Sequence, residues 1–442
     1  MSGAPDDGAQ AAGAVPAAAS AGAAPAVAVA AAVAVDGGEL PLGGGLLSLL
    51  RPALDLVEPG GVVALLSSSG GVREDLPAWC RLERHEYLGR AAAPDGRDRH
   101  LVARSALGVP RGPRESGLRL PRRAGGALLA ADVVAAVPLP ERADPASGFA
   151  PRGARVEPGG PPYPFTLLER DRVAPPEIGA LYDQAVAAQW DASRDIPWDK
   201  VRALSPALER ALGQVMTFLA ENELSALYVP SRFVARVHPA YAEVAMFLAT
   251  QLADEARHVD VFLKRARAAG GGAGVSSAAT SRSLLSLLEP DDFTVAAFLL
   301  SVLGEGTFLD LLRFVETHAP DDATAEIARR TRADEARHVH FGVAHVRHGL
   351  ACDPSLFARL EAAVRLRAAT LHDLAGVPAP LQDALTILAA AGDDPRAVGR
   401  GHDAFRQLLD DMHHNRIKRL QTAGFTAAQA EHLSALHTPN FM

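Results

Sequence analysis

The chain has 442 residues, of which 48% are hydrophobic and 22% are charged, so it can build two or three domains with sizeable cores. A net charge of -8 and a pI near 6.0 provide no basic surface for nucleic acid or an anionic membrane, which leaves small molecules and proteins as the expected partners. The two cysteines, Cys80 and Cys352, form no CxxC pair. This excludes a disulfide framework and a thiolate zinc site, and it is typical of the reducing cytoplasm.

Residues 1–34 form an alanine-rich tract that is interrupted by prolines. Its apolar run lacks the basic residues that open a signal peptide, and it is too short to span a membrane. We therefore expect a disordered tail and no membrane association. An export or anchoring role is the less favoured alternative, since such tracts can resemble the apolar part of a signal peptide.

Residues 35–106 show short alternating elements. An apolar run at helical spacing covers residues 46–57, a Pro-Gly-Gly turn follows at 59–61, and a buried-strand pattern occupies 62–66 before a second helix and strand. This order predicts a small α/β domain. Together with the segment DLPAWCR at 75–81, it resembles the TusA/SirA-like sulfur-carrier fold.

The TusA/SirA-like resemblance implies a fold without its usual activity. The working residue of that family is a cysteine in a Cys-Pro motif at the start of the first helix, and this chain has glycines there, at residues 43–45. Persulfide chemistry needs a thiolate. Cys80 is expected to be a core residue rather than a substitute nucleophile, because free cysteine is among the most buried residue types.

The remainder of the chain has two parts that differ in composition. Residues 107–175 are rich in Pro, Gly and Arg and predict a long, partly structured connector. Residues 176–437 contain long amphipathic segments separated by short breakers, which is typical of a helical bundle. Helices are expected near residues 176–190, 205–236, 240–268, 291–318, 322–349, 355–374, 380–391 and 396–422.

An internal repeat is the strongest signal in the sequence. The hexapeptide DEARHV fills residues 254–259 and returns unchanged at 334–339. Each copy contains Glu-x-x-His, and positions i and i+3 share one face of a helix, so the carboxylate and the imidazole can bind the same metal ion. The candidate ligands from the repeat are Glu255, His258, Glu335 and His338.

A third glutamate follows from the position of a helix turn. Pro320 marks the turn, Glu335 lies fifteen residues after it, and Glu305 lies fifteen residues before it. Both arms of an antiparallel hairpin rise about 1.5 Å per residue, so arms of equal length return to the same height. Glu305 is therefore expected to face Glu335.

The fourth glutamate follows from the other hairpin. Pro239 marks its turn, with Glu255 sixteen residues after it and Glu223 sixteen residues before it. Glu223 lies on the apolar stripe of its helix and Glu221 does not, which favours Glu223, although the sequence alone leaves the choice between them open. A buried carboxylate at Glu223 or Glu305 is costly without a partner, and metal coordination removes that cost.

Charge balance indicates the metal. Four glutamates carry four negative charges and two ferrous ions carry four positive charges, so the centre is neutral when two histidines are added. Oxygen ligands combined with imidazole suit iron or manganese. We expect two iron ions, and a Mn/Fe pair is left open.

The rest of the repeated motif is expected to support the ligands. A metal-bound histidine usually donates its other N–H to a carboxylate, a role that suits Asp254 and Asp334, with Arg257 and Arg337 balancing their charge. The alternative is that these four side chains form exposed ion pairs on the helix surface. Trp190 is expected to pack at the opening of the bundle rather than to bind substrate.

These motifs resemble the ferritin-like diiron-carboxylate superfamily, which includes bacterial multicomponent monooxygenases, ribonucleotide reductase small subunits and the p-aminobenzoate N-oxygenase group. The resemblance covers about residues 205–350, in the order Glu, Glu-x-x-His, Glu, Glu-x-x-His. It implies a mainly α fold, a ferritin-like four-helix bundle with extra helices, preceded here by the small α/β domain. The N-oxygenase group has an additional histidine one turn before its last motif, and Thr331 stands at that place here.

The resemblance favours a non-haem diiron oxidoreductase that uses dioxygen to oxidise a small organic substrate. Oxygenase, N-oxygenase and desaturase chemistry all remain open. An electron donor such as a ferredoxin or a flavin reductase is implied, since the chain has no flavin or nicotinamide fingerprint. The alternatives are a non-catalytic iron-binding or ferroxidase-type protein, and a scaffold that docks a sulfur-relay or other partner. A homodimer and a cytoplasmic location are compatible with the sequence.

Overall fold

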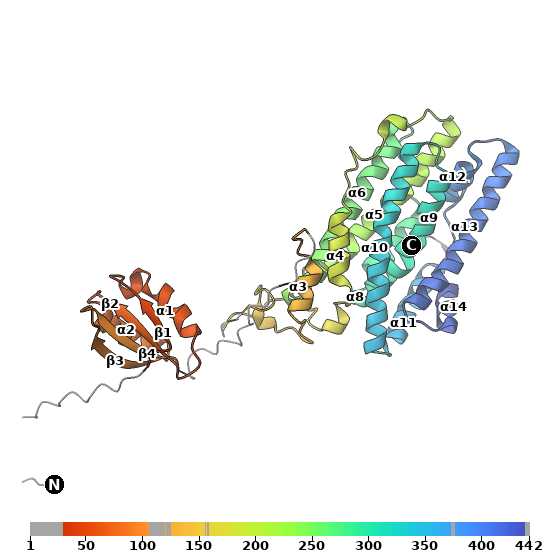
Figure 1. Cartoon of the computed structure of the whole chain (residues 1–442). Coiled ribbons are helices and arrows are strands. Elements are labelled where there is room, and N and C mark those ends of the chain that lie inside the picture. The colour runs from red at the N-terminus through yellow and green to blue at the C-terminus, as the bar shows by residue number, and fades with distance from the viewer. Residues whose placement is uncertain are drawn as a thin grey trace, which may run out of the picture. The chain divides into compact units, whose positions relative to one another are not determined.

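The fold is described from a computed structural model of the chain (Figure 1). The described residues are 30–105, 120, 125–154, 156, 159–372 and 376–437. Contacts divide the chain into two compact units, residues 1–114 and 115–442. The tail expected at residues 1–34 lies outside the described residues except for 30–34.

The small unit is a mixed four-stranded sheet with two helices. The strand order is β1-β2-β4-β3, with β1 parallel to β2 and β4 antiparallel to both of its neighbours. The predicted helix, strand, helix and strand are all present, and a strand is added at each end. The elements are β1 (Val33–Asp36), α1 (Leu46–Asp55), β2 (Val62–Ser67), α2 (Val72–Leu82), β3 (Glu86–Ala92) and β4 (Asp98–Ala103).

The core of the small unit explains Cys80. Apolar side chains of α1, β2 and α2 form one cluster, and Cys80 is fully buried within it. Burial raises the pKa of the Cys80 thiol to about 12, so the thiol stays protonated and inert. The expectation that Cys80 is a core residue is confirmed. The likeness to the TusA/SirA-like fold remains a prediction.

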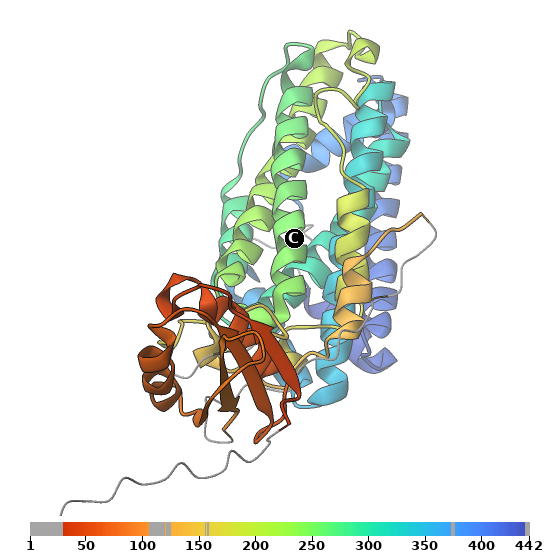
Figure 2. The same ribbon diagram turned by 60° about the vertical axis from the view of Figure 1, so that its left-hand side comes forward.

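The helical unit contains two long hairpins (Figures 1 and 2). In the first, α5 (Pro206–Val234) packs along α6 (Ala242–Ala268). In the second, a rod that ends in α9 (Gly306–Thr317) packs along α10 (Asp322–Cys352). Helices α4 and α12 pack on the first hairpin, and α13 packs on the second. The remaining helices are α3 (Ala130–Ala136), α4 (Ile178–Ala187), α7 (Ala278–Leu288), α11 (Leu356–Thr370), α12 (Ala379–Ala390), α13 (Pro395–Thr422) and α14 (Ala427–Leu436).

The fold class expected from the sequence, a mainly helical four-helix bundle with extra helices and a small α/β domain before it, is confirmed. Helices α3, α7 and α14 were not predicted. They have 7, 11 and 10 residues, so their apolar periodicity is brief and they depend on packing against the larger helices.

Side-chain caps determine where the hairpin arms begin. Ser205 accepts a hydrogen bond from the backbone N–H of Leu208 at 3.3 Å, and Asp321 accepts one from Thr324 at 2.8 Å. The buried Arg265 guanidinium of α6 also donates to Asp321 at 3.0 Å. The cap of α10 is thereby connected to the first hairpin, which holds the two hairpins at a common height.

The helix expected at residues 291–318 is continuous but not α-helical throughout. It consists of α8 (Phe293–Ala297), a π-helical segment (Phe298–Glu305) and α9. Widened π turns shift side chains around the helix axis and are frequent at functional sites. The Arg419 guanidinium of α13 donates to the backbone carbonyl of Val302 within this segment at 2.7 Å. The neighbouring helix thus stabilises the widened turn.

One helix of the described residues is long and apolar enough to cross a membrane, the rod from Phe293 to Thr317. Of its most apolar window, 83% is buried inside the protein. Its apolar character is therefore explained by its position in the core of the bundle.

Replacing Gly306 by alanine is expected to destabilise the helical unit. A methyl group at this position would overlap the Arg419 guanidinium, which would have to give up its bond to Val302. Overpacking of this kind costs about 1–3 kcal/mol. A lower thermal unfolding midpoint for Gly306→Ala would show it. The control is Gly399→Ala in α13, where the added methyl meets open space and should be neutral or slightly stabilising.

Candidate metal centre

The structure brings the six expected ligands together in the interior of the helical unit. Helix α5 supplies one, α6 two, the π-helical segment one and α10 two. Each has an exposed fraction of 2% or less. They are Glu223, Glu255, His258, Glu305, Glu335 and His338.

The six side chains form two overlapping groups. In each group the potential ligand atoms all lie within 4.8 Å of one another. Glu255 and Glu335 belong to both groups, whereas each remaining residue belongs to one. Two cations in these positions would share the two central carboxylates, and each would have one further glutamate and one histidine. The members are Glu223, Glu255, His258 and Glu335 in one group, and Glu255, Glu305, Glu335 and His338 in the other.

Both histidines present Nδ1 to the carboxylates. His258 Nδ1 lies 3.2 Å from Glu255 Oε2, 3.2 Å from Glu335 Oε1 and 3.5 Å from Glu223 Oε2. His338 Nδ1 lies 3.0 Å from Glu255 Oε1 and 3.6 Å from Glu335 Oε2. The equal distances of the paired glutamates from the two helix turns predicted that these side chains lie at one height, and the structure brings them together there.

Many of these oxygen atoms have no hydrogen-bond donor. Each of the four glutamates has at least one buried carboxylate oxygen that accepts no hydrogen bond from the described residues, and Glu335 has two. Glu305 has neutral donors nearby, since Gln251 Nε2 donates to Glu305 Oε1 at 3.1 Å and the Ser301 hydroxyl interacts with the same carboxylate. Buried carboxylate oxygens without partners are costly, and bound cations satisfy them. The donor set thus fits a pair of divalent cations.

The electrostatics of the metal-free centre lead to the same conclusion. Burial, reinforced by repulsion from the Glu335 carboxylate, raises the pKa of Glu223 and Glu305 well above the usual range. Burial alone would lower the pKa of His338, but the carboxylates of Glu255, Asp254 and Glu335 together outweigh it and raise that pKa. Without metal, protons must therefore neutralise the cluster, whereas two divalent cations would do so with all four carboxylates ionised.

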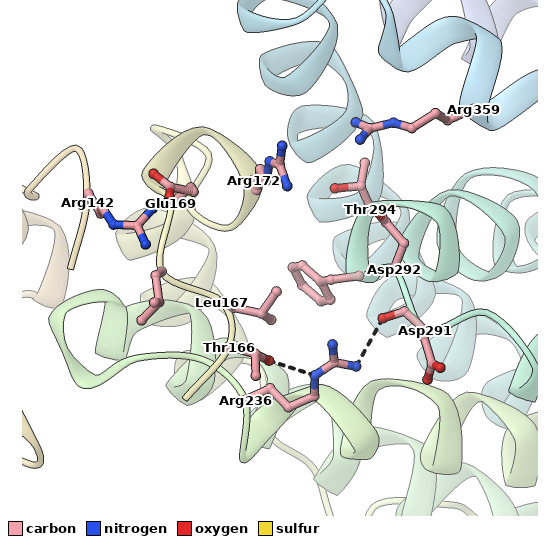
Figure 3. A pocket seen from close by; sticks show the side chains of 12 residues that line it. Arg142, Thr166, Leu167, Glu169, Arg172, Arg236, Asp291, Asp292, Thr294 and Arg359 are labelled. Carbon is pink, nitrogen blue, oxygen red and sulfur yellow. Dashed lines mark hydrogen bonds and ion pairs between the residues drawn. The ribbon is translucent and has the colours of Figure 1, made fainter. Parts of the chain in front are cut away.

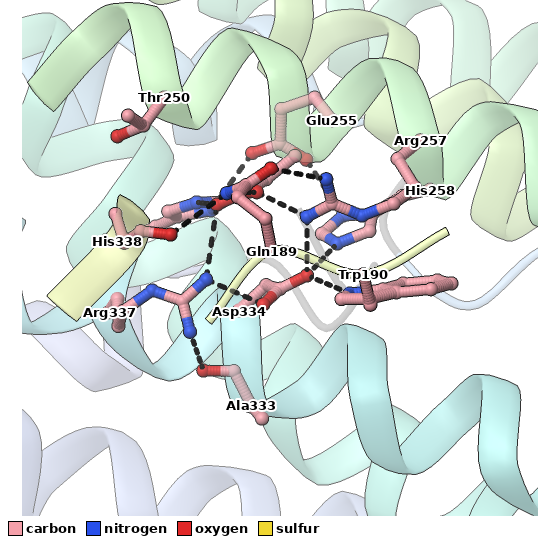
Figure 4. A network of polar contacts seen from close by, with 12 residues as sticks. Gln189, Trp190, Thr250, Glu255, Arg257, His258, Ala333, Asp334, Arg337 and His338 are labelled. Atoms are coloured by element: carbon pink, nitrogen blue, oxygen red, sulfur yellow. Dashed lines mark hydrogen bonds and ion pairs between the residues drawn. The ribbon is translucent and has the colours of Figure 1, made fainter. Parts of the chain in front are cut away.

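Two aspartates orient the histidines in a crossed arrangement (Figure 4). His258 Nε2 on α6 lies 3.0 Å from Asp334 Oδ2 on α10, and His338 Nε2 on α10 lies 3.3 Å from Asp254 Oδ2 on α6. An ionised carboxylate can only accept, so Nε2 carries a proton, and a cation that replaces the Nδ1 proton would meet the Nδ1 lone pair at the centre. The alternative of exposed ion pairs is wrong, because both aspartates are fully buried.

Two arginines balance the aspartates. Arg257 is paired with Asp254 and donates to Asp334 at 3.0 Å, while Arg337 donates to Asp334 at 2.5 Å and to Asp254 at 3.2 Å. Two positive charges therefore offset two negative charges in this outer layer. The negative charge of the four glutamates is left for the metal ions.

The sequence did not reveal two further members of this network (Figure 4). Trp190 donates through Nε1 to Asp334 Oδ2 at 2.7 Å, and its ring lies 4.8 Å from the Arg257 guanidinium. Gln189 donates to Asp254 at 3.0 Å and accepts from Arg257 at 2.8 Å. Both follow α4, which lies outside the repeated motif. Trp190 therefore does more than pack at the opening of the bundle.

Two other positions lie outside the centre. Glu221 belongs to neither ligand group, so the geometry favours Glu223 as the carboxylate of α5. Thr331 is buried on α10 one turn before Glu335, and its hydroxyl has no hydrogen-bond partner among the described residues. It is not part of either group.

Comparisons with known proteins provide a distant likeness. No protein-family model and no curated protein matches the chain. Among solved structures, a variant of an R2-like ligand-binding oxidase with an aerobically reconstituted Mn/Fe cofactor is similar at 17% identity and a TM-score of 0.40. Another variant with an Fe/Fe cofactor has 18% identity and the same score. Both alignments cover 60% of this chain and 94% of the other.

Similarity this distant does not say what this chain binds. That question depends on its own side chains. Four helices contribute two Glu-x-x-His motifs and two further inward glutamates, which is the arrangement of ferritin-like carboxylate bundles. The helical unit is a ferritin-like bundle with a buried carboxylate and histidine centre that could hold two metal ions.

Replacing Glu305 by glutamine is expected to have opposite effects on the metal-free and metal-loaded proteins. Because the folded pKa of Glu305 is raised, its contribution to metal-free stability is present at acidic pH and is lost as pH rises through that pKa. Glu305→Gln should therefore flatten the fall in metal-free stability toward neutral pH while reducing the stabilisation that metal provides. Denaturant unfolding at several pH values, with and without chelator, measures both effects.

The control for that experiment is Glu431→Gln on the exposed face of α14. It should leave both profiles unchanged. A Glu305 variant with the same pH profile and the same metal-dependent stabilisation as the unmodified chain would contradict the prediction.

Replacing Trp190 by phenylalanine is expected to weaken metal binding. The change keeps an aromatic ring but removes the donor that holds Asp334, the residue that orients His258. Loss of such an outer partner typically costs on the order of 10- to 100-fold in metal affinity. Competition with a chromogenic chelator measures the affinity. Trp198→Phe is the matched control, because Trp198 Nε1 donates to the backbone carbonyl of Ala192, outside the network.

Proposed function

We propose that this chain is a non-haem diiron oxidase that uses dioxygen to oxidise a small organic molecule. The observation that carries the proposal is the pair of overlapping ligand groups, which share two carboxylates and contain oxygen atoms without donors. A lone cation site would need one such group. Two adjacent metal ions with shared carboxylates can deliver more than one electron to dioxygen at a single place. We assign the ligand role to Glu223, Glu255, His258, Glu305, Glu335 and His338.

Other residues of the chain prepare this centre. Asp254 and Asp334 hold the Nε2 protons of the two histidines, which keeps each Nδ1 lone pair directed inward. Arg257 and Arg337 keep those aspartates ionised and fixed in place. The buried surroundings limit the access of water, which protects a reactive centre from side reactions.

The nature of the two metals is proposed as Fe/Fe, with Mn/Fe as an alternative that the same ligands would accept. The reaction is proposed as oxygenation, N-oxygenation or desaturation. The position of Thr331 argues against the N-oxygenase type, because no additional histidine is available one turn before Glu335. Its hydroxyl is not one of the grouped ligands.

A separate electron donor is part of the proposal, with a ferredoxin or a flavin reductase as candidates. The small unit is proposed to dock such a donor or another protein partner, since its only cysteine is buried and protonated. Donor-coupled turnover that is unchanged after residues 1–114 are deleted would contradict this docking role.

The competing function is iron binding or ferroxidase activity without an organic substrate. The same ligand set would support it. The two functions differ in stoichiometry, because an oxidase retains its two metal ions through turnover, whereas a storage protein accumulates oxidised iron far above that number.

The proposal predicts about two iron ions per chain after anaerobic loading with ferrous iron, one for each ligand group. Rapid mixing with oxygenated buffer should then produce a transient visible absorbance together with oxygen consumption. Elemental analysis, stopped-flow absorbance and an oxygen electrode measure the three quantities. His338→Ala and Glu223→Ala should each reduce the iron content and abolish the absorbance change.

Thermal unfolding checks that these two variants remain folded. Purified protein that binds no iron or manganese, with a stability unaffected by either substitution, would contradict a metal centre. Progressive iron accumulation without substrate oxidation would favour the ferroxidase alternative.

A further inference from the structure

A separate pocket lies on the helical unit where α8 begins (Figure 3). It has a volume of about 420 Å³ and is bordered by the segment 166–172, the start of α8 and one residue of α11. Its lining is strongly charged, with four arginines and three acidic residues. The arginines are Arg142, Arg172, Arg236 and Arg359.

The acidic residues of this pocket already have partners. Glu169 is paired with Arg142, and Asp291 Oδ1 accepts from Arg232, which lies outside the lining, at 2.9 Å. Asp292 Oδ1 accepts a backbone N–H at the start of α8 at 3.0 Å. Glu169 and Asp291 are thus paired with Arg142 and Arg232, and Asp292 caps α8.

The lining holds more arginines than acidic residues, and Arg236 has no ion-pair partner among the described residues. Arg236 is held by neutral acceptors, with Nε donating to Thr166 Oγ1 at 3.0 Å and an Nη atom donating to the backbone carbonyl of Asp291 at 3.0 Å (Figure 3). The charges of Arg172 and Arg359 both act on the Asp353 carboxylate. A guanidinium without a carboxylate partner, as in Arg236, suits the carboxylate or phosphate group of a ligand.

A second, smaller cavity lies near the metal centre. Its walls include Leu248, Leu300 and Phe341, and its polar members are Ser301 and Gln251, the latter a donor to Glu305. Its free volume of about 10 Å³ is close to the space needed for one water molecule. The cavity is therefore almost closed, and it ends beside a proposed metal ligand.

Phe293 lines both the charged pocket and the inner cavity. Its side chain is buried, with its ring centroid 5.2 Å from that of Phe233 and 5.0 Å from that of His345. It is the first residue of α8, next to the turn that precedes the rod.

We propose that the charged pocket binds the anionic group of an amphipathic substrate, and that Phe293 gates the passage of its apolar body toward Glu305. Phe293 and Glu305 lie twelve residues apart on one rod, which is at most about 18 Å. The substrate class is thus an organic anion with an extended apolar body. The oxidation of this substrate near Glu305 rests on the proposed diiron function. Its binding in the charged pocket does not.

Isothermal titration of the purified full-length chain with sodium decanoate and with inorganic phosphate tests the inference. Decanoate should bind, and Arg236→Gln should weaken it on the order of 10- to 100-fold, because a charge-assisted hydrogen bond is lost. Phosphate should bind more weakly than decanoate and should also depend on Arg236. Arg400→Gln, an exposed arginine of α13, is the matched control and should bind both probes as the unmodified chain does.

The gate is tested with two substitutions. Phe293→Trp should lower the affinity for decanoate at least tenfold and leave the affinity for phosphate unchanged, since phosphate stays in the outer pocket. Phe293→Ala should accelerate decanoate association in stopped-flow measurements. Circular dichroism and thermal unfolding establish whether each variant is folded. If the tryptophan variant is unfolded, the alanine variant tests the gate by itself.

Equal decanoate binding by the unmodified chain and Arg236→Gln would overturn the anion pocket. Loss of binding in Arg236→Gln with no effect of either Phe293 substitution would overturn the gated passage. Binding is measured without turnover, so the two proposals fail separately. Normal decanoate binding with no oxygen reactivity would contradict the diiron function alone, and normal oxygen reactivity with no decanoate binding would contradict only this inference.

Discussion

Four carboxylates converge inside the helical unit, within less than 5 Å of one another in each ligand group, and this concentration of negative charge is the constraint on which the rest of the structure depends. Like charges at such distances repel strongly in a medium of low dielectric. The fold cannot relieve the repulsion by exposure, because every one of these side chains is buried. Either protons or cations must enter, and the absence of donors for several oxygen atoms favours cations.

The layer around the centre is built so that it does not compete for those cations. Asp254 and Asp334 would add to the negative charge, but Arg257 and Arg337 each contact both of them and cancel it. The crossed pairing also ties α6 to α10, so the distance between the two metal-binding motifs is set by the same contacts that orient the histidines. The same contacts thus position the ligands and hold α6 against α10.

The rod from Phe293 to Thr317 connects the centre to the exterior. Its π-helical segment ends at Glu305 and is supported by Arg419 of α13, so a helix outside the two hairpins influences the orientation of a proposed ligand. Its first residue, Phe293, lines both the charged pocket and the inner cavity. One helical element therefore carries the proposed metal ligand, the wall of the inner cavity and the proposed gate.

The sequence by itself determined the bundle, the two motifs and the heights of the four glutamates, because helical periodicity and the positions of two prolines are local properties. The structure identified Glu223 rather than Glu221 in the cluster and showed that each aspartate serves the histidine of the opposite motif. Only tertiary packing decided the roles of Gln189 and Trp190, the π-helical segment and the charged pocket. These features arise where segments distant in sequence meet, and no local pattern encodes which side chains will face each other there.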